Sequence, residues 1–156
     1  HADSVQMANM APMVNTRGPL YVHPEGIVRR TTVHVLEMYA NLLGGRVGEV
    51  FVDAPDFVHG EAAVPALDAV VTCDDAEQDW RLAMVNRLPD RDLDCTIVVG
   101  GQPLEGTHRA AVLDGDGPDA FNDVDQPSRV VPREAEFRFV EGRTALPPHS
   151  VIVLTL

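Results

Sequence analysis

The stretch Glu134-Ala-Glu-Phe-Arg-Phe-Val140 carries the clearest structural signal in the 156-residue chain. In it Ala135, Phe137 and Phe139 alternate with charged side chains, and this period of two is that of a half-buried antiparallel strand. One face of the strand should lie in the core and the other in water. We therefore predict an antiparallel strand over residues 134–140 with both phenylalanines buried.

Outward from this strand, short β-branched and apolar runs follow one another after Gly18. Pro, Gly and Asp clusters separate them at intervals of roughly ten residues, a spacing typical of a sandwich or barrel. About ten strands exceed a single small sheet, so we expect two packed antiparallel sheets. Residues 36–43 could form a short helix or an irregular excursion. The other strand candidates are Ile27–Val35, Val47–Val52, Leu67–Cys73, Trp80–Arg87, Thr96–Val99, Ala110–Leu113 and Val151–Leu156.

The opening of the chain has a different pattern. An apolar stripe at helical spacing predicts an N-terminal helix within residues 1–17 that ends or kinks near Ala11, because Pro12 cannot continue it. Residues 18–156 are then the sandwich. The stripe consists of Val5, Met7, Ala8, Met10, Ala11 and Val14.

Composition limits the partners of the chain. Its 45% hydrophobic and 23% charged residues are values of a globular domain, and the length suits one such domain. Twelve basic residues, all of them arginine, face 24 acidic ones, which gives a net charge of −12. This charge repels phosphate backbones and anionic lipid, so we expect neither nucleic acid nor a membrane as a partner.

Motifs that would carry chemistry are weak. The acidic loop Asp114–Asp119 fails the register of an EF-hand, since Pro118 falls where a ligand belongs, and is interpreted as a solvated turn. The six histidines show no metal-type spacing. Cys73 and Cys95 are expected to be small buried thiols. No nucleophile elbow is present, so the residues predict no metal, no cofactor and no catalytic group.

Stretches at both ends of the chain and several internal ones resemble the sequence motifs of one family. These motifs follow one another in the same order as in that family. They are similar to the last part of the intracellular α-L-arabinofuranosidases of glycoside hydrolase family 51, in which a barrel helix leads into the final domain. The stretches are HADSVQMANMAPMVN (1–15), Arg29-Arg-Thr31, Leu67-Asp-Ala69, Val85-Asn-Arg87, Phe121-Asn with Gln126–Pro132, and LPPHSVIVLTL (146–156).

The resemblance implies that residues 1–17 are the last helix of a preceding catalytic (β/α)8 barrel. Residues 18–156 would be a C-terminal antiparallel β-sandwich of jelly-roll type that packs on this barrel and supports assembly. The parent would be a cytoplasmic retaining glycosidase, with one glutamate as acid and one as nucleophile, acting on arabinose-containing oligosaccharides. Both glutamates belong to the barrel, so we expect none in this chain. A homo-oligomer is also expected. The chain starts at His1 rather than Met, which we interpret as a fragment or processed piece.

Departures from the family pattern bear on the substrate. The resemblance places Asn9, Pro12 and Asn15 near the bound arabinosyl unit, but Pro12 stands where the family has Gln and offers no amide to a sugar hydroxyl. In the segment that resembles "WRQT", Val28 and Arg30 replace Trp and Gln. His34 and Val35 stand where Tyr-Pro is common.

A carbohydrate-binding module that itself holds a plant polysaccharide is the alternative to a non-catalytic sandwich. Such modules display coplanar exposed aromatic rings that stack on sugars. The chain has 5% aromatic residues and one tryptophan, Trp80, which shares its strand face with Leu82 and Met84. Trp80 is therefore predicted to belong to the core, which favours the structural role.

Overall fold

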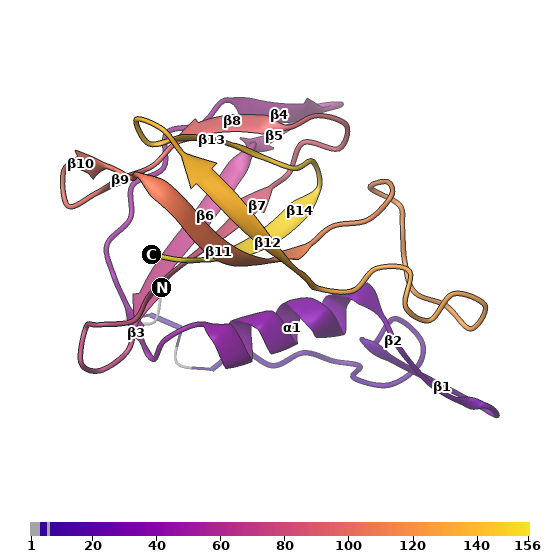
Figure 1. Ribbon diagram of the computed structural model, residues 1–156. Helices are drawn as coiled ribbons and strands as arrows, with labels where there is room; N and C mark the ends of the chain where they lie inside the picture. Colours follow the sequence, from indigo (N-terminus) through magenta and orange to yellow (C-terminus); the bar gives the residue numbers. More distant parts are fainter. Residues whose placement is uncertain (1–3, 6) are drawn as a thin grey trace.

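A six-stranded antiparallel sheet forms the centre of the computed structural model, which describes residues 4, 5 and 7–156. Its strands lie in the order β12, β11, β14, β7, β6, β3 (Figure 1). The sequence prediction placed four of them almost to the residue. The bounds are β3 (Arg46–Val47), β6 (Leu67–Cys73), β7 (Trp80–Asn86), β11 (Gly106–Leu113), β12 (Arg133–Phe139) and β14 (Ser150–Thr155).

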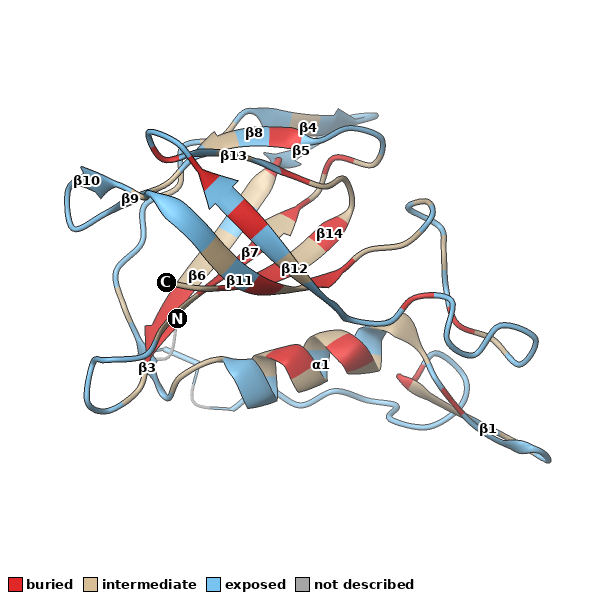
Figure 2. Ribbon diagram, in the orientation of Figure 1, coloured by how far each residue is buried: buried red, intermediate tan, exposed pale blue. Residues whose placement is uncertain are grey.

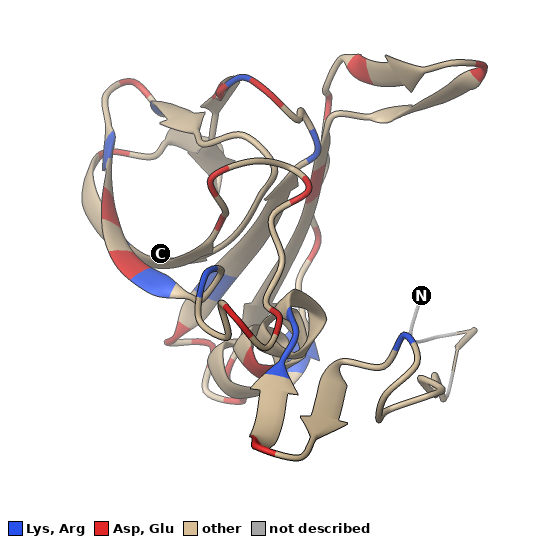
Figure 3. Cartoon of the chain, turned by 90° about the vertical axis from the view of Figure 1, so that its right-hand side faces the viewer, with Lys and Arg blue, Asp and Glu red and all other residues tan. Residues whose placement is uncertain are grey.

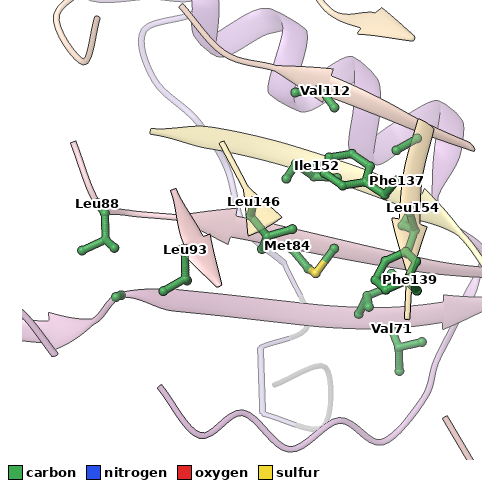
Figure 4. Close-up of a cluster of buried hydrophobic side chains, with 13 residues drawn as sticks. Val71, Met84, Leu88, Leu93, Val112, Phe137, Phe139, Leu146, Ile152 and Leu154 are labelled. Carbon is green, nitrogen blue, oxygen red and sulfur yellow. The ribbon is translucent and has the colours of Figure 1, made fainter. Parts of the chain in front are cut away.

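The main hydrophobic core lies on one face of this sheet. A two-stranded ribbon of β8 (Leu93–Thr96) and β13 (Arg143–Leu146) covers that face and contributes Leu93 and Leu146 to it. Phe137 and Phe139 of β12 point into the same cluster, beside Met84 and Leu154 (Figure 4). Both phenylalanines are buried, as the alternation predicts. The expected all-β sandwich is thus confirmed.

The opposite face of the sheet is covered by helix α1 (Thr31–Leu42), which lies beneath it in Figure 1. Met38 of the helix is buried against Ala83 and Val153 of the sheet, and Val35 and Tyr39 pack beside it. No helix in the described part of the chain is long and apolar enough to cross a membrane. Residues 36–43 could be a short helix or an irregular excursion, and the structure shows that residues 36–42 belong to a helix. This helix begins at Thr31, five residues before that stretch.

The predicted strand Ile27–Val35 is therefore wrong beyond Arg29, where β2 (Gly26–Arg29) ends. Thr31, Thr32 and Val33 have strand propensity, but apolar side chains at positions 35, 38 and 39 recur at helical spacing and find the sheet as a partner. Burial of that stripe outweighs the small differences in propensity.

Two further strand predictions are wrong in part. The strand Val47–Val52 is reduced to its first residue, because residues 48–55 leave the sheet as an irregular segment. The run Thr96–Val99 is not a central strand, since β8 ends at Thr96 and β9 (Val98–Val99) pairs with β10 (Gln102–Pro103) in an exposed hairpin. An apolar run shows that a segment can be buried, but not that another element covers it.

Two hairpins that the sequence analysis missed project from the sandwich. They are β1 (Leu20–His23) with β2, and β4 (Asp56–His59) with β5 (Ala62–Pro65). Both extend away from the body of the molecule in Figure 3. The turn of the second hairpin contains Gly60 at φ +61, a backbone angle that favours glycine. Strands of four residues are too short to show a recognisable alternation in the sequence.

The predicted N-terminal helix is also wrong for the described residues. Residues 7–15 contain no helix, whereas residues 1–3 and 6 of the predicted stretch lie outside the described part. The apolar stripe is solvent-exposed, with Met7 at 77% (Figure 2). A helix this short is marginal in water unless its apolar face packs on another element, and here that face has no partner. Pro12 limits its length further.

Candidate functional site

The three residues expected near a sugar lie on the exposed opening segment. Asn9 and Pro12 are exposed. Asn15 shapes the chain instead: its Oδ1 accepts the backbone N–H of Val22 at 2.7 Å, and its own N–H donates to the Leu20 carbonyl at 2.7 Å. This side-chain oxygen is therefore used by the β1–β2 hairpin.

Arg30, one of the departures from the family pattern, joins the opening segment to this hairpin. Its Nη1 donates to the carbonyls of Thr16 at 2.9 Å and Gly18 at 3.0 Å. The guanidinium also lies 5.2 Å from the centre of the Tyr21 ring, within range of a cation–π contact. Arg30 thus holds residues 16–21 against the start of α1, a role that only the structure reveals.

A polar cluster at the start of α1 surrounds His34. Arg29 forms an ion pair with Glu37, and the Glu37 carboxylate lies 3.5 Å from His34 Nδ1. Burial and the nearby Arg29 charge lower the pKa of His34, and Glu37 opposes this only in part. Within the described residues, His34 Nε2 and Thr31 Oγ1 are buried without a hydrogen-bond partner. Burial at the start of α1 thus favours the neutral form of His34.

Asn122 attaches the long loop between β11 and β12 to this end of the molecule. Its Nδ2 donates to the carbonyls of Arg29 at 2.9 Å and Val130 at 2.8 Å, and its Oδ1 accepts the Val130 N–H at 2.7 Å. The residue is almost completely buried. Asn122 falls in the family-like run that begins at Phe121, and its place between the loop prolines Pro118 and Pro127 is the signal that the sequence offers for its role.

The acidic loop, which the sequence predicts to be a solvated turn, is held by two ion pairs. Arg133 pairs with Asp114 at 2.6 Å, and Arg129 pairs with Asp116 at 2.8 Å. The hydrogen bonds from Arg129 hold the pKa of Asp116 below its usual value. Among the described residues, no three His, Cys, Asp or Glu side chains are grouped so that they could hold a metal ion.

A mainly apolar cavity of about 870 Å³ opens between the two layers, beside the segment of residues 48–55. Trp80 forms part of its wall and packs against the main core, and the indole Nε1 donates to the Glu77 carbonyl at 3.0 Å. The Trp80 ring is thus held by the core and is not free to stack on a sugar. Cys95 borders the same cavity, where burial raises the pKa of its thiol to about 11, and Cys73 is a buried free thiol.

Comparison with known proteins places this fold in one family. The family model of the α-L-arabinofuranosidase C-terminal domain matches residues 1–150. An intracellular exo-α-(1→5)-L-arabinofuranosidase of Streptomyces lividans is 33% identical over 141 residues, which are 87% of this chain and 21% of the relative. The chain thus spans about a fifth of that relative.

Two solved structures agree with this assignment. The GH51 arabinofuranosidase of Xanthomonas axonopodis pv. citri superposes with a TM-score of 0.86 and 26% identity, over 100% of this chain and 32% of that one. The family 51 α-L-arabinofuranosidase AbfB of Bifidobacterium longum gives 0.83 and 27%, over 100% and 30%. The chain therefore belongs to the family of α-L-arabinofuranosidase C-terminal domains, as the resemblance in its sequence implies.

Proposed function

We propose that the chain is the non-catalytic β-sandwich of a retaining α-L-arabinofuranosidase and packs on the catalytic barrel of that enzyme. Residues 1–17 would belong to the barrel as its last helix, and residues 18–156 would form the sandwich. The relatives named above are arabinofuranosidases several times longer than this chain. The name of the Streptomyces relative includes "intracellular", which supports a cytoplasmic location.

The observation that carries this proposal is the uncovered apolar surface of the opening segment. Met7, Met10 and Met13 are all exposed, and so are Val22 and Ile27 of the adjoining hairpin. Single exposed apolar side chains are normal, but a contiguous series of them marks a surface that packs on another body. A barrel that covered this stripe would also supply the partner that an amphipathic helix needs.

Catalysis in this proposal is performed by the parent enzyme. A retaining glycosidase needs one carboxylic acid to protonate the leaving oxygen and a carboxylate about 5 Å away to attack the sugar. In the described residues, the carboxylates that have a displaced pKa are Asp74 and Asp116, and both are displaced downward. Such groups stay ionised and cannot act as the acid. Asn9, Pro12 and Asn15 would approach the arabinosyl unit only once the barrel has ordered the segment.

The test is reconstitution. The 156-residue chain alone should not hydrolyse an aryl α-L-arabinofuranoside, whereas the same chain fused behind a family 51 barrel should. In the fused protein, Met10→Asp should lower the melting temperature and the activity, because it places a charge in the proposed contact. Val58→Asp on β4 is the matched control, since Val58 is also exposed and does not line the cavity between the two layers. Turnover by the isolated chain that is lost on mutating one of its own glutamates would overturn the proposal.

A further inference from the structure

The free edge of β12 forms one margin of the central sheet (Figure 1). Within the described residues this seven-residue strand pairs only with β11. The strand at the other margin, β3, has two residues and is followed by the irregular segment of residues 48–55. β12 thus presents the longer open edge, and such an edge is a row of unpaired N–H and C=O groups that can pair with another strand.

The register of the sheet shows which backbone groups of β12 point outward. The Leu156 N–H donates to the Trp80 carbonyl at 3.0 Å, so the even-numbered residues of β14 bond to β7. Along an antiparallel strand, successive residues bond to opposite sides. The odd-numbered residues of β14 therefore bond to β11, and the even-numbered residues of β11 bond to the odd-numbered ones of β12. The N–H and C=O groups of Glu134, Glu136 and Arg138 are left pointing away from the sheet.

These three outward residues have no partner in the described part of the chain. All three are exposed, and no described residue bonds to their outward backbone groups or to their side chains. Charged side chains of one sign would protect an edge from a second copy of itself by repulsion. The charges of β12 are of both signs, so this protection is missing.

The charges along β12 are complementary to themselves. A two-fold axis at Glu136 would place two copies of the strand antiparallel, with residue 133 opposite residue 139 and the strands overlapping over their whole length. Glu134 of each copy then lies opposite Arg138 of the other. Opposite charges in such cross-strand positions attract. Each outward residue would also exchange two backbone hydrogen bonds with the residue opposite.

The centre and the ends of this arrangement are also matched. The axis brings the two Glu136 side chains together, and like charges in opposite positions repel. In each copy, however, the exposed and unpaired Arg109 lies opposite Glu136 across β11 and β12, so each carboxylate has a guanidinium beside it. At each end, Val140, which is 54% exposed, falls opposite the exposed Pro132 of the other copy.

The net charge of the strand favours this edge over other surfaces. β12 contains two arginines and two glutamates and is neutral, although the whole chain carries −12. Two copies therefore approach each other with less repulsion at β12 than at an acidic surface. We propose that the β12 edges of two copies pair antiparallel about a two-fold axis at Glu136 and join the two central sheets into one.

The test is sedimentation equilibrium of the 156-residue chain at about 0.15 M salt, where long-range repulsion is screened. A contact made by one pair of strands is small, so the measurement extends to about 1 mM chain. We expect a reversible equilibrium between monomer and dimer. Glu134→Arg and Arg138→Glu should each weaken dimerisation about tenfold, because both opposite-charge pairs become like-charge pairs.

An equimolar mixture of these two variants should associate as strongly as the unmodified chain, because each pair of opposite charges is restored between the two different copies. Arg91→Glu is the matched control for Arg138→Glu. It makes the same change of charge at an exposed position between β7 and β8, and it should leave dimerisation unchanged.

Cross-linking tests the position of the axis. Glu136→Cys places two thiols opposite each other, at a Cα separation of about 5.5 Å that a disulfide spans, so mild oxidation should link two copies. Glu134→Cys is the control, because residues 134 of the two copies would lie about 14 Å apart and should not be linked. Cys73 is buried and Cys95 lines the cavity, so neither should link two copies.

Three outcomes would overturn the proposal: a monomer up to about 1 mM, association that both charge variants leave unchanged, or cross-linking at residue 134 rather than 136. The exposed opening segment is the competing contact surface. Met10→Asp should leave dimerisation unchanged, and its loss in that variant alone would assign the contact to the opening segment. The activity of the barrel fusion tests the proposed function separately, because pairing through β12 does not require the barrel.

Discussion

Truncation of Phe139 to alanine tests the packing of the sandwich core directly. Its ring is 1% exposed and packs edge-on against His108, with the ring centroids 5.6 Å apart. Losing the buried ring costs about 2–3 kcal/mol of transfer free energy. Because β12 is paired with β11 along its length, the site cannot collapse freely, and a residual cavity of about 80 Å³ adds about 2 kcal/mol. We expect the free energy of unfolding to fall by about 4–5 kcal/mol, a large part of the roughly 5–15 kcal/mol of an ordinary domain.

Urea unfolding at pH 7, followed by circular dichroism, measures this loss from the shift in midpoint at constant slope. Phe51→Ala is the matched control, because the same ring is removed from a side chain that is 89% exposed, and its effect should stay within about 0.5 kcal/mol. A loss below about 2 kcal/mol for Phe139→Ala, or equal losses in the two variants, would refute the assigned register of β12.

Three further predictions concern the loops and the thiols. Asn122→Ala should destabilise the protein by about 2–4 kcal/mol and speed hydrogen exchange at Val130, because buried backbone groups lose their partner; unchanged exchange would contradict this. The pKa of Asp116 is lowered by folding, so its stabilising contribution is present above the unfolded pKa of about 3.9 and disappears as the pH falls through the folded value. Asp116→Asn should therefore flatten the melting-temperature profile between about pH 5 and 2, and an unaltered acid slope would count against the Arg129 pair. Cys95, with its pKa at about 11, should react with a thiol reagent at pH 8 far more slowly than a free cysteine, and rapid labelling of the folded chain would show that the thiol is not buried as described.

Four strands of the central sheet are what the sequence determined reliably, two of them, β7 and β12, from a period of two. β6 and β7 were predicted almost to the residue, and β12 and β14 within one residue at each end. Alternation is local, because successive side chains of a strand point to opposite faces whatever lies beside it. Family membership was also readable, since several short motifs keep one order along the chain.

The site residues were predicted from the resemblance and not from a pattern of period two. Asn9, Pro12 and Asn15 were named from the resemblance and stay predictions, and the structure adds that the Asn15 side chain accepts a hydrogen bond from Val22 of β1. The cross-strand pair of Arg109 and Glu136 gave no signal, because the two residues are 27 apart in the sequence and meet only through the pairing of β11 with β12. Sequence spacing does not show which strands become neighbours.

Tertiary structure decided between conformations that the local sequence left nearly equal in free energy. Residues 31–42 form a helix because Met38 and its neighbours find the sheet to pack against. The stripe from Met7 to Val14 also has helical spacing, yet it finds no partner and stays exposed and irregular. The free energy that separates a helix from an irregular chain comes mainly from apolar surface buried against distant parts of the molecule, so two stretches with similar apolar spacing adopt different conformations.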